Sequence, residues 1–464
     1  MESNAPEEKK LYEQFRKKTS TINPNEVKKM NRAFTIWGKC ISAVFLCIWI
    51  FAIWHFTARA EHWYLLGGLM FFYMMVKKVL ALMYFPCTSE LTKPYKVTAL
   101  ITCYNENPSS VVAIMENILA LDYRVHEIIF LDDGSKDTLA YEVAKSFAEA
   151  YQDKENAPLF QVIRFEQNRG KRELIADGLQ RVTGDYVFLL DSDSEILPNA
   201  LTELLRPFED GKTTSCVGEI GVINRNENFC TRMQSVKYFG AFQLGRAAQS
   251  VTGDVVVCSG AFSVHKMDFL LENLEEIKAT KLFGITVSAG DDRAMTYLSR
   301  KSGGKTRYQN TAYCETEVPN TWGKFVSQRR RWQRSGYIGS LTAVRDLFPK
   351  KLWFLMWSVS DTYFWLVALI IFLISVIQRG FYFDARDVIL YHFIIMYIHN
   401  GFYLLYRPLQ FIIVPIYSFV YGLFLLYTRI YAAVTIKHDG WGTRGASMKK
   451  EDYKSSEIYS DWMF

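Results

Sequence analysis

From residue 96 to about residue 320, short apolar runs typical of buried strands alternate with patterns typical of amphipathic helices. This order predicts a β-α-β arrangement, in which mostly parallel strands form one sheet and helices cover both of its faces. Ligands of such sheets bind at the carboxyl ends of the strands. The predicted strands are residues 97–102, 127–131, 160–165 and 185–190, and the predicted helices are residues 111–121, 140–148 and 171–182.

Long apolar segments flank this α/β domain on both sides, and 50% of all residues are hydrophobic. Several segments are long enough to cross a bilayer. We therefore expect an integral membrane protein. The expected parts are a cytoplasmic arm (1–32) with a short helix near 11–15, a transmembrane hairpin (33–85), the α/β domain (95–322), interfacial helices (323–350), a second transmembrane hairpin (351–406), an interfacial or re-entrant segment (407–436) and a cytoplasmic tail (437–464).

The charge pattern favours a lipid bilayer as a partner and argues against nucleic acid. The net charge is +6, and the lysines and arginines gather beside apolar runs. No basic domain with interleaved aromatic residues is present. Positive charges on both outer ends of the first hairpin place those ends on the cytoplasmic side. The eight cysteines contain no CxxC pair, so neither a zinc site nor a disulfide framework is indicated.

Acidic and aromatic residues follow several of the predicted strands. Asp191 and Asp193 come directly after the strand at 185–190, and residues two apart on an extended chain point to the same side. Two carboxylates in this position can bind Mg²⁺ or Mn²⁺ together with water and substrate phosphates. A solvated acidic turn is the alternative, whereas an EF-hand is disfavoured because Ile196 occupies the position that needs glycine. Tyr104 and Asp133 follow two other strands.

Three further motifs carry charge or paired carboxylates. Asn-Arg-Gly-Lys-Arg-Glu at residues 168–173 begins a predicted helix and could bind a diphosphate, or could be a solvated helix start. Gly-Asp-Asp-Arg at residues 290–293 offers a second carboxylate pair. Gln-Arg-Arg-Arg-Trp at residues 328–332 lies where the α/β domain meets the membrane segments, and by itself it would be read as a patch at the membrane surface.

Together with Asp-Asp-Gly at 132–134 and Asp-Ser-Asp at 191–193, these motifs resemble the ordered signature of processive, membrane-integrated family-2 glycosyltransferases. The resemblance is to hyaluronan, chitin and chitooligosaccharide synthases, and it covers roughly residues 95–445. Ser259-Gly260 and the sequence Trp-Gly-Thr-Arg-Gly at residues 441–445 strengthen it. It implies a GT-A glycosyltransferase domain embedded between transmembrane helices, a UDP-sugar donor, and Mg²⁺ or Mn²⁺ as the cofactor.

The resemblance also implies roles for individual residues. Asp292 matches the catalytic base and Asp193 the metal ligand, with Asp191 at the nucleotide end. Tyr104 and Asp133 match the positions that hold uracil, and Lys171 matches a nucleotide contact. The positions that match substrate contacts near the acceptor, or in a second motif closing over the site, are Ser259, Gly260, Gln328, Arg331, Trp332, Trp441 and Arg444.

These roles describe an inverting enzyme that transfers sugar from UDP-N-acetylglucosamine, with or without UDP-glucuronate, to a growing β-linked polysaccharide and passes the polymer outward. The motif spellings leave hyaluronan and chitin both open. A non-processive enzyme that adds one sugar to a lipid carrier is the alternative, and a transporter or membrane scaffold is a third class. Because the donor is cytosolic, we expect two crossings near 353–377 and 388–406, a cytosolic catalytic domain, and residence in the plasma membrane.

Overall fold

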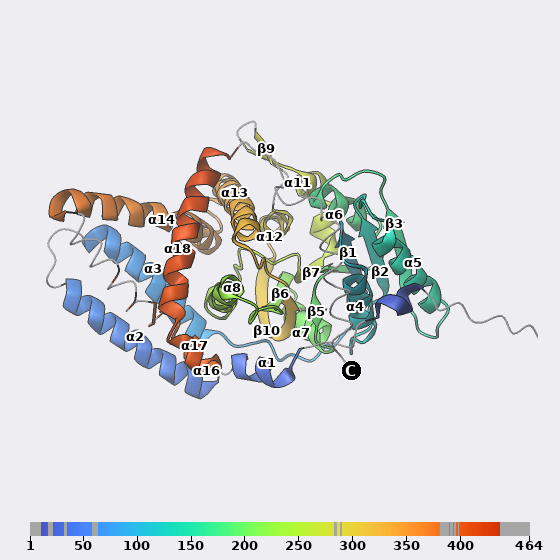
Figure 1. Ribbon diagram of the computed structural model, residues 1–464, viewed down its shortest axis with the longest axis horizontal. Coiled ribbons are helices and arrows are strands. Elements are labelled where there is room, and N and C mark those ends of the chain that lie inside the picture. The colour runs from blue at the N-terminus through green and yellow to red at the C-terminus, as the bar shows by residue number, and fades with distance from the viewer. Residues whose placement is uncertain are drawn as a thin grey trace, which may run out of the picture.

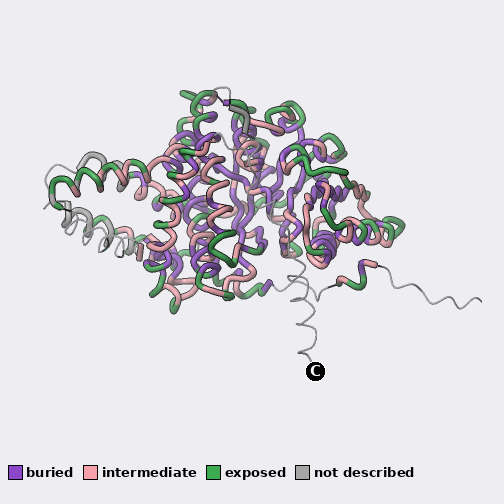
Figure 2. Tube along the Cα trace, turned by 45° about the horizontal axis from the view of Figure 1, so that its top comes forward, coloured by how far each residue is buried: buried purple, intermediate pink, exposed green. Residues whose placement is uncertain are grey.

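The computed structural model describes residues 11–16, 22–31, 35–57, 64–282, 285–287, 290–380 and 399–436, and single residues at 389, 393, 396 and 397. An α/β domain forms one side of the molecule, and the long helices α2 (Ile36–Thr57), α3 (Tyr64–Met83) and α14 (Leu352–Arg379) extend from the other side (Figure 1). Figure 2 shows that buried residues concentrate in the α/β domain and at its junction with the helices.

The domain is built on an eight-stranded sheet with the order β3-β2-β1-β4-β7-β6-β10-β5. Neighbouring strands from β3 to β4 are parallel, as are β6 and β10, whereas β7 runs antiparallel to both of its neighbours and β5 runs antiparallel to β10. The strands are β1 (Val97–Cys103), β2 (Glu127–Asp132), β3 (Leu159–Arg164), β4 (Tyr186–Asp191), β5 (Glu195–Ile196), β6 (Thr213–Val222), β7 (Phe262–Lys266) and β10 (Lys305–Thr316).

The predicted α/β fold is confirmed, and the helices between the first four strands also lie where the sequence places them. These helices are α4 (Pro108–Leu119), α5 (Leu139–Tyr151) and α6 (Lys171–Leu179). β1 pairs with β2 on one side and with β4 on the other, so the strand order reverses at β1. The carboxyl ends of β1, β2 and β4 therefore meet at a switch point, which is where open α/β sheets bind ligands.

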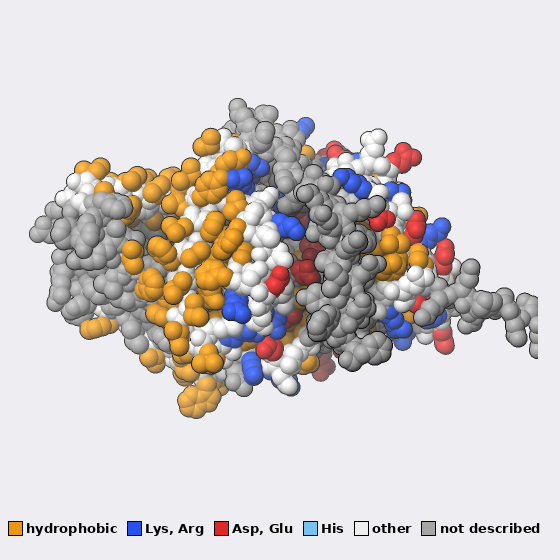
Figure 3. Space-filling model, in the orientation of Figure 1, with side chains coloured by type: hydrophobic (Ala, Val, Ile, Leu, Met, Phe, Trp, Pro, Cys, Tyr) orange, Lys and Arg blue, Asp and Glu red, His pale blue; other side chains and the backbone are white. Residues whose placement is uncertain are grey.

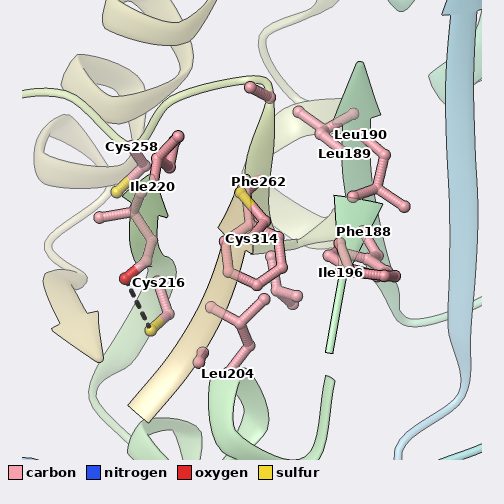
Figure 4. Packing of buried hydrophobic residues seen from close by; sticks show 14 of the residues in the cluster. Phe188, Leu189, Leu190, Ile196, Leu204, Cys216, Ile220, Cys258, Phe262 and Cys314 are labelled. Carbon is pink, nitrogen blue, oxygen red and sulfur yellow. Dashed lines mark hydrogen bonds between the residues drawn. The ribbon is translucent and has the colours of Figure 1, made fainter. Parts of the chain in front are cut away.

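Apolar side chains between the sheet and its helices form the core of the domain. Phe188 of β4 and Phe262 of β7 lie in neighbouring antiparallel strands, with ring centroids 5.9 Å apart (Figure 4). Cys216, Cys258 and Cys314 belong to the same buried cluster. All eight cysteines are free thiols, as expected from their spacing.

The second half of the domain surrounds β6, β7 and β10 with short helices. A π-helical segment separates α8 from α9, and a small two-stranded sheet precedes α12. These elements are α7 (Ala200–Leu205), η3 (Arg206–Asp210), α8 (Phe229–Gly240), η4 (Ala241–Arg246), α9 (Ala247–Thr252), α10 (Met267–Leu271), α11 (Leu274–Lys278), β8 (Thr280–Leu282), β9 (Ile285–Val287) and α12 (Asp291–Lys301).

One continuous helix, α13 (Trp322–Leu347), connects the domain to the membrane helices. The sequence predicted interfacial helices over 323–350, and the structure has a single helix there. α13 packs against α12 of the domain and against α14 and α18 (Val414–Val434). It therefore links the α/β domain directly to the apolar part of the molecule.

Two described helices are long and apolar enough to cross a membrane, at Leu352–Gln378 and Val414–Val434. In Figure 1, α18 runs across α14 rather than beside it. α16 (Gly401–Tyr406) and α17 (Pro408–Phe411) precede α18, while most of the predicted span at 388–406 lies outside the described residues. Asp361 of α14 accepts hydrogen bonds from Tyr73 (2.6 Å) and Lys77 (2.8 Å), so it faces other protein groups.

The described parts of the amino-terminal segment pack against the rest of the chain. The short helix expected near residues 11–15 is present as η1 (Leu11–Phe15), where Tyr12 is buried with its ring centroid 5.2 Å from that of Phe147. In α1 (Pro24–Met30), Glu26 forms ion pairs with Arg225 (3.1 Å) and Arg407 (2.7 Å). These contacts hold both helices against the rest of the chain.

Candidate active site

Lys171 joins two carboxylates that are far apart in the sequence. Its Nζ lies 2.5 Å from Asp191 Oδ1 at the end of β4, and 3.9 Å from Asp291 Oδ2 at the start of α12. Burial lowers the pKa of Lys171, but the charges of Asp191, Asp291 and Asp292 outweigh it and raise the pKa overall. A permanently charged ammonium group therefore lies between the two acidic motifs, beside the switch point of the sheet.

The turn that contains Asp133 contacts the loop before α6. Asp133 is buried, and its carboxylate accepts hydrogen bonds from the backbone NH groups of Arg169 (2.9 Å) and Gly170 (3.1 Å). Gly134 has a φ of +69°, and a Cβ there would lie 2.7 Å from the carbonyl carbon of Gln167. A glycine is needed because of both this φ and this close approach.

Tyr104 lies next to the same turn. Its neighbour Asn105 donates a backbone hydrogen bond to Ser135 Oγ (2.8 Å) and accepts one from the backbone NH of Lys136 (2.9 Å). The ends of β1 and β2 are thereby tied together, which brings Tyr104 and Asp133 to the same edge of the sheet. Each of these two residues directly follows the end of its strand, Tyr104 after β1 and Asp133 after β2.

Asp193 is the carboxylate expected to bind a divalent cation. Thr316 Oγ1 donates to its Oδ1 (3.3 Å). Burial, together with the negative charges of Asp191 and Glu317, raises the pKa of Asp193 to about 7. A bound cation would offset this repulsion, so the donor set fits Mg²⁺ or Mn²⁺.

No group of three or more His, Cys, Asp or Glu side chains among the described residues could hold a metal ion. A carboxylate such as Asp193 can bind Mg²⁺ together with substrate phosphates and water. The sequence prediction did not include Thr316 or Glu317. Both lie at the end of β10, and only the sheet topology brings them to Asp193.

Asp292, the expected base, lies in the first turn of α12. Its Oδ1 accepts a hydrogen bond from the backbone NH of Arg293 (2.7 Å). Burial and the charge of Asp291 raise the pKa of Asp292, and the charge of Arg293 opposes this rise. A carboxylate with a raised pKa is a better proton acceptor near neutral pH than an ordinary aspartate.

The turn before Asp292 is held against α13. Gly290 has a φ of +81°, and a Cβ at this position would lie 1.8 Å from Ser335 Oγ. Gly260, from the predicted Ser259-Gly260 pair, belongs to the same site, because its Cβ would lie 3.3 Å from Asp291 Oδ2 and 3.9 Å from Lys171 Nζ. Four separate segments of the chain therefore meet around Lys171 and Asp291.

The predicted acceptor residues lie on α13, close to this turn. Trp332 is one helical turn before Ser335, and its side chain is 38% exposed. Gln328 Oε1 is buried without a hydrogen-bond partner in the described part of the chain. Arg331 lies between them in the same helix. α13 thus brings Gln328, Arg331 and Trp332 towards the Gly290 turn, whereas Trp441 and Arg444 lie outside the described residues.

The structure adds two side chains that the sequence analysis did not single out. Asp291 contacts Lys171, although the resemblance pointed only to the next residue. Burial raises the pKa of Tyr238 of α8 to about 12, with smaller effects from the charges of Arg329, Tyr421, Asp193 and Asp191. No local pattern marks Tyr238, because its position depends on how α8 packs against the sheet.

Comparisons with known proteins agree with this geometry. The model of the family described as "Glycosyl transferase family 2" matches residues 98–273, and that described as "Glycosyl transferase family group 2" matches residues 186–431. A hyaluronan synthase from Streptococcus pyogenes serotype M1 is 31% identical over 383 residues, which cover 82% of this chain and 90% of the relative.

An N-acetylglucosaminyltransferase from Mesorhizobium japonicum is 29% identical over 252 residues, which cover 54% of this chain and 58% of the relative. A mannosyltransferase from Pyrobaculum calidifontis, solved with GDP-Man and Mn²⁺, has a TM-score of 0.54 at 18% identity and covers 86% of this chain and 98% of its own. That structure supports the GT-A fold. The chain therefore belongs to glycosyltransferase family 2 and is a hyaluronan-synthase-like glycosyltransferase.

Proposed function

We propose that this protein is a membrane polysaccharide synthase. It transfers N-acetylglucosamine, with or without alternating glucuronate, from UDP-sugars to a growing β-linked polymer and passes that polymer across the membrane. The observation that carries the proposal is the bridge from Lys171 to both Asp191 and Asp291, two acidic residues from motifs far apart in the sequence. The likeness to a hyaluronan synthase over most of both chains supports it.

The donor nucleotide binds at the carboxyl ends of β1, β2 and β4. Tyr104 and Asp133 hold the uracil ring, and Asp191 and Lys171 line the diphosphate end. Asp193 would hold a divalent cation, which when bound would supply positive charge to the departing UDP. Lys171 adds a fixed positive charge on the same side, because its ammonium group stays protonated in this acidic setting.

The acceptor approaches from the side of α13. Trp332 offers a partly exposed indole face, which suits the apolar face of a pyranose ring. Asp292 takes the proton from the acceptor hydroxyl as that oxygen attacks the anomeric carbon, and the bond from that carbon to UDP breaks on the opposite face. The transfer therefore inverts the anomeric configuration without a covalent intermediate on the protein.

Other residues complete the binding of donor and acceptor. Arg331 adds charge-assisted hydrogen bonds to the diphosphate, and Gln328 lies at the acceptor entrance. Ser259 and Gly260 line the sugar side, where the absence of a side chain at Gly260 leaves room beside Asp291. Trp441 and Arg444 match a second substrate-binding motif, and both lie outside the described residues.

The catalytic domain faces the cytosol, and the enzyme resides in the plasma membrane. α14 and the segment around 388–406 form two crossings, and α18 lies along the membrane surface. The direction of α18 across α14 supports this arrangement (Figure 1). Figure 3 shows apolar side chains spread over the part of the surface where α14 and α18 lie, with lysines and arginines along the border towards the α/β domain.

The test is the size of the product. Purified protein in lipid nanodiscs is incubated with labelled UDP-N-acetylglucosamine, with and without UDP-glucuronate. We expect long polymer in at least one condition. A product that carries one added sugar on a lipid would instead support the non-processive alternative, and no UDP release from any sugar nucleotide would contradict both.

A further inference from the structure

Arg329 is a buried cation without a counter-charge. It is 5% exposed, and its Nε and Nη2 have no hydrogen-bond partner among the described residues. No carboxylate in the described part of the chain forms an ion pair with it. Burying a guanidinium group without compensation carries a large desolvation penalty, so such a group is expected where a ligand completes its contacts.

Aromatic rings surround this guanidinium group. Its central carbon lies 4.2 Å from the ring centroid of Trp332, 5.2 Å from that of Phe325 and 5.4 Å from that of Tyr421. Phe325, Arg329 and Trp332 are spaced by four and three residues, so they share one face of α13. Tyr421 comes from α18, which packs against this face. The rings hold the cation in place but leave its charge unneutralised.

A second cation lies over the same tyrosine ring. Lys237 of α8 has its Nζ 5.2 Å from the centroid of Tyr421 and donates a hydrogen bond to Ser418 Oγ (2.9 Å). Lys237 forms no ion pair with the described residues either. Arg329, Lys237 and Tyr421 therefore form a positively charged aromatic cluster where α8, α13 and α18 meet, which we call the α8–α13–α18 cluster.

This cluster lies next to the proposed acceptor position. Trp332 is both the ring closest to Arg329 and the partly exposed indole proposed to stack on the acceptor sugar. Lys237 belongs to α8, which packs against α18, the helix that carries Tyr421. An anion held by the cluster would therefore lie beside the sugar on Trp332.

Within the proposed function, we infer that Arg329 and Lys237 bind the carboxylate of an acidic sugar at the acceptor end of the polymer. A guanidinium group and an ammonium group match a small carboxylate in charge and geometry. The donor diphosphate is less suitable, because Arg331 is two positions further along α13 and points to a different side of the helix. A neutral acceptor would leave both cations unpaired, so the cluster selects acidic polymer ends.

The experiment compares two acceptors. Full-length protein in nanodiscs of neutral phosphatidylcholine receives labelled UDP-N-acetylglucosamine and a short oligosaccharide that ends in either glucuronate or glucose. These two ends differ only in the carboxylate. We expect the wild-type protein to use the glucuronate end with a kcat/KM roughly 10- to 100-fold higher, as expected for hydrogen bonds to a charged group.

Arg329→Gln should remove this preference, because it should raise KM for the acidic acceptor much more than KM for the neutral acceptor. Lys237→Gln should weaken the preference in the same direction. Arg330→Gln is the matched control, because Arg330 stacks on Tyr427 and Tyr431, on another side of α13, and should keep the full preference. UDP binding by each variant shows that it is folded.

Several results would overturn the inference. Equal use of both acceptors by the wild-type protein would do so, as would a loss in Arg329→Gln that affects both acceptors alike. If Arg329→Gln fails to bind UDP, Lys237→Gln decides the test. An unchanged preference of that variant for the acidic acceptor would then overturn the inference. A difference that appears only in nanodiscs with anionic lipid would assign the cluster to a lipid headgroup. Failure of the wild-type protein to transfer to either acceptor would reject the proposed function itself.

Discussion

Asp291 contacts Lys171 and directly precedes Asp292, the proposed base. We expect it to influence the pKa of that base. Asp291 is 7% exposed and carries a negative charge next to Asp292. Like charges at this separation disfavour ionisation of the second group. Burial and the negative charge of Asp291 together keep the pKa of Asp292 above its ordinary value.

This arrangement predicts a pH effect. Transfer by the wild-type protein should fall as the pH falls through the raised pKa of Asp292, because the protonated carboxyl group cannot accept a proton. Asp291→Asn removes the neighbouring charge and lowers the pKa of Asp292, so the acidic limb of the kcat/KM profile should move to lower pH. Glu275→Gln, in an exposed part of α11, serves as the control. An unchanged acidic limb in Asp291→Asn would contradict this account.

At the scale of elements, α13 contacts the Gly290 turn, which joins the proposed acceptor residues to the proposed base. Gly290 needs a positive φ, and it also leaves no room for a methyl group against Ser335. Any shift of α13 would therefore move the turn that carries Asp291 and Asp292. The sequence of the motif alone does not reveal this coupling.

Gly290→Ala should reduce transfer strongly and lower the unfolding temperature. Gly303→Ala is the matched control, because Gly303 has a similar φ of +93° but no atom lies within 4 Å of its Cβ position. The control should lose about 1–2 kcal/mol through backbone strain. Gly290→Ala should lose a further 1–3 kcal/mol through overpacking. Thermal unfolding in detergent and initial rates measure both effects, and equal losses in the two variants would show that Ser335 is irrelevant.

The elements show how far sequence reasoning reaches in this protein. The strands from β1 to β4 were predictable because each is a short apolar run ending in polar residues, and their carboxyl ends carry the predicted Tyr104, Asp133 and Asp191. The contributions of Thr316, Glu317 and Tyr238 to the site were not predictable from the sequence. They depend on strand order and on the packing of helices, which bring together residues far apart in the chain. The burial of Arg329 also depends on packing, so it cannot be predicted from a run of three arginines.

At the scale of the whole molecule, the proposed topology places both ends of the catalytic machinery on one side of the bilayer. The α/β domain and the tail from residue 437 must share the cytosol if Trp441 and Arg444 close over the donor. Two crossings between them satisfy this condition, and α18 then lies along the surface with exposed Leu423, Ile430 and Val434 towards lipid.

A glycosylation tag tests this arrangement. A tag placed after Lys450 should remain unmodified in microsomes, whereas a tag inserted between residues 378 and 388, in the loop proposed to face outward, should be modified. Modification of the tag after Lys450 would mean an odd number of crossings between the domain and the tail, and the surface position of α18 would be wrong.

The central claim is that Asp193 and Asp292 act on one sugar nucleotide, the first through a cation and the second as a base. The most direct measurement is UDP binding with Mn²⁺ or with a chelator, made beside transfer rates, for the wild-type protein, Asp193→Asn and Asp292→Asn. We predict that Asp193→Asn loses the Mn²⁺-dependent part of UDP binding, while Asp292→Asn binds UDP normally and transfers no sugar. Metal-dependent UDP binding that survives in Asp193→Asn, or turnover at the wild-type rate in Asp292→Asn, would contradict the claim.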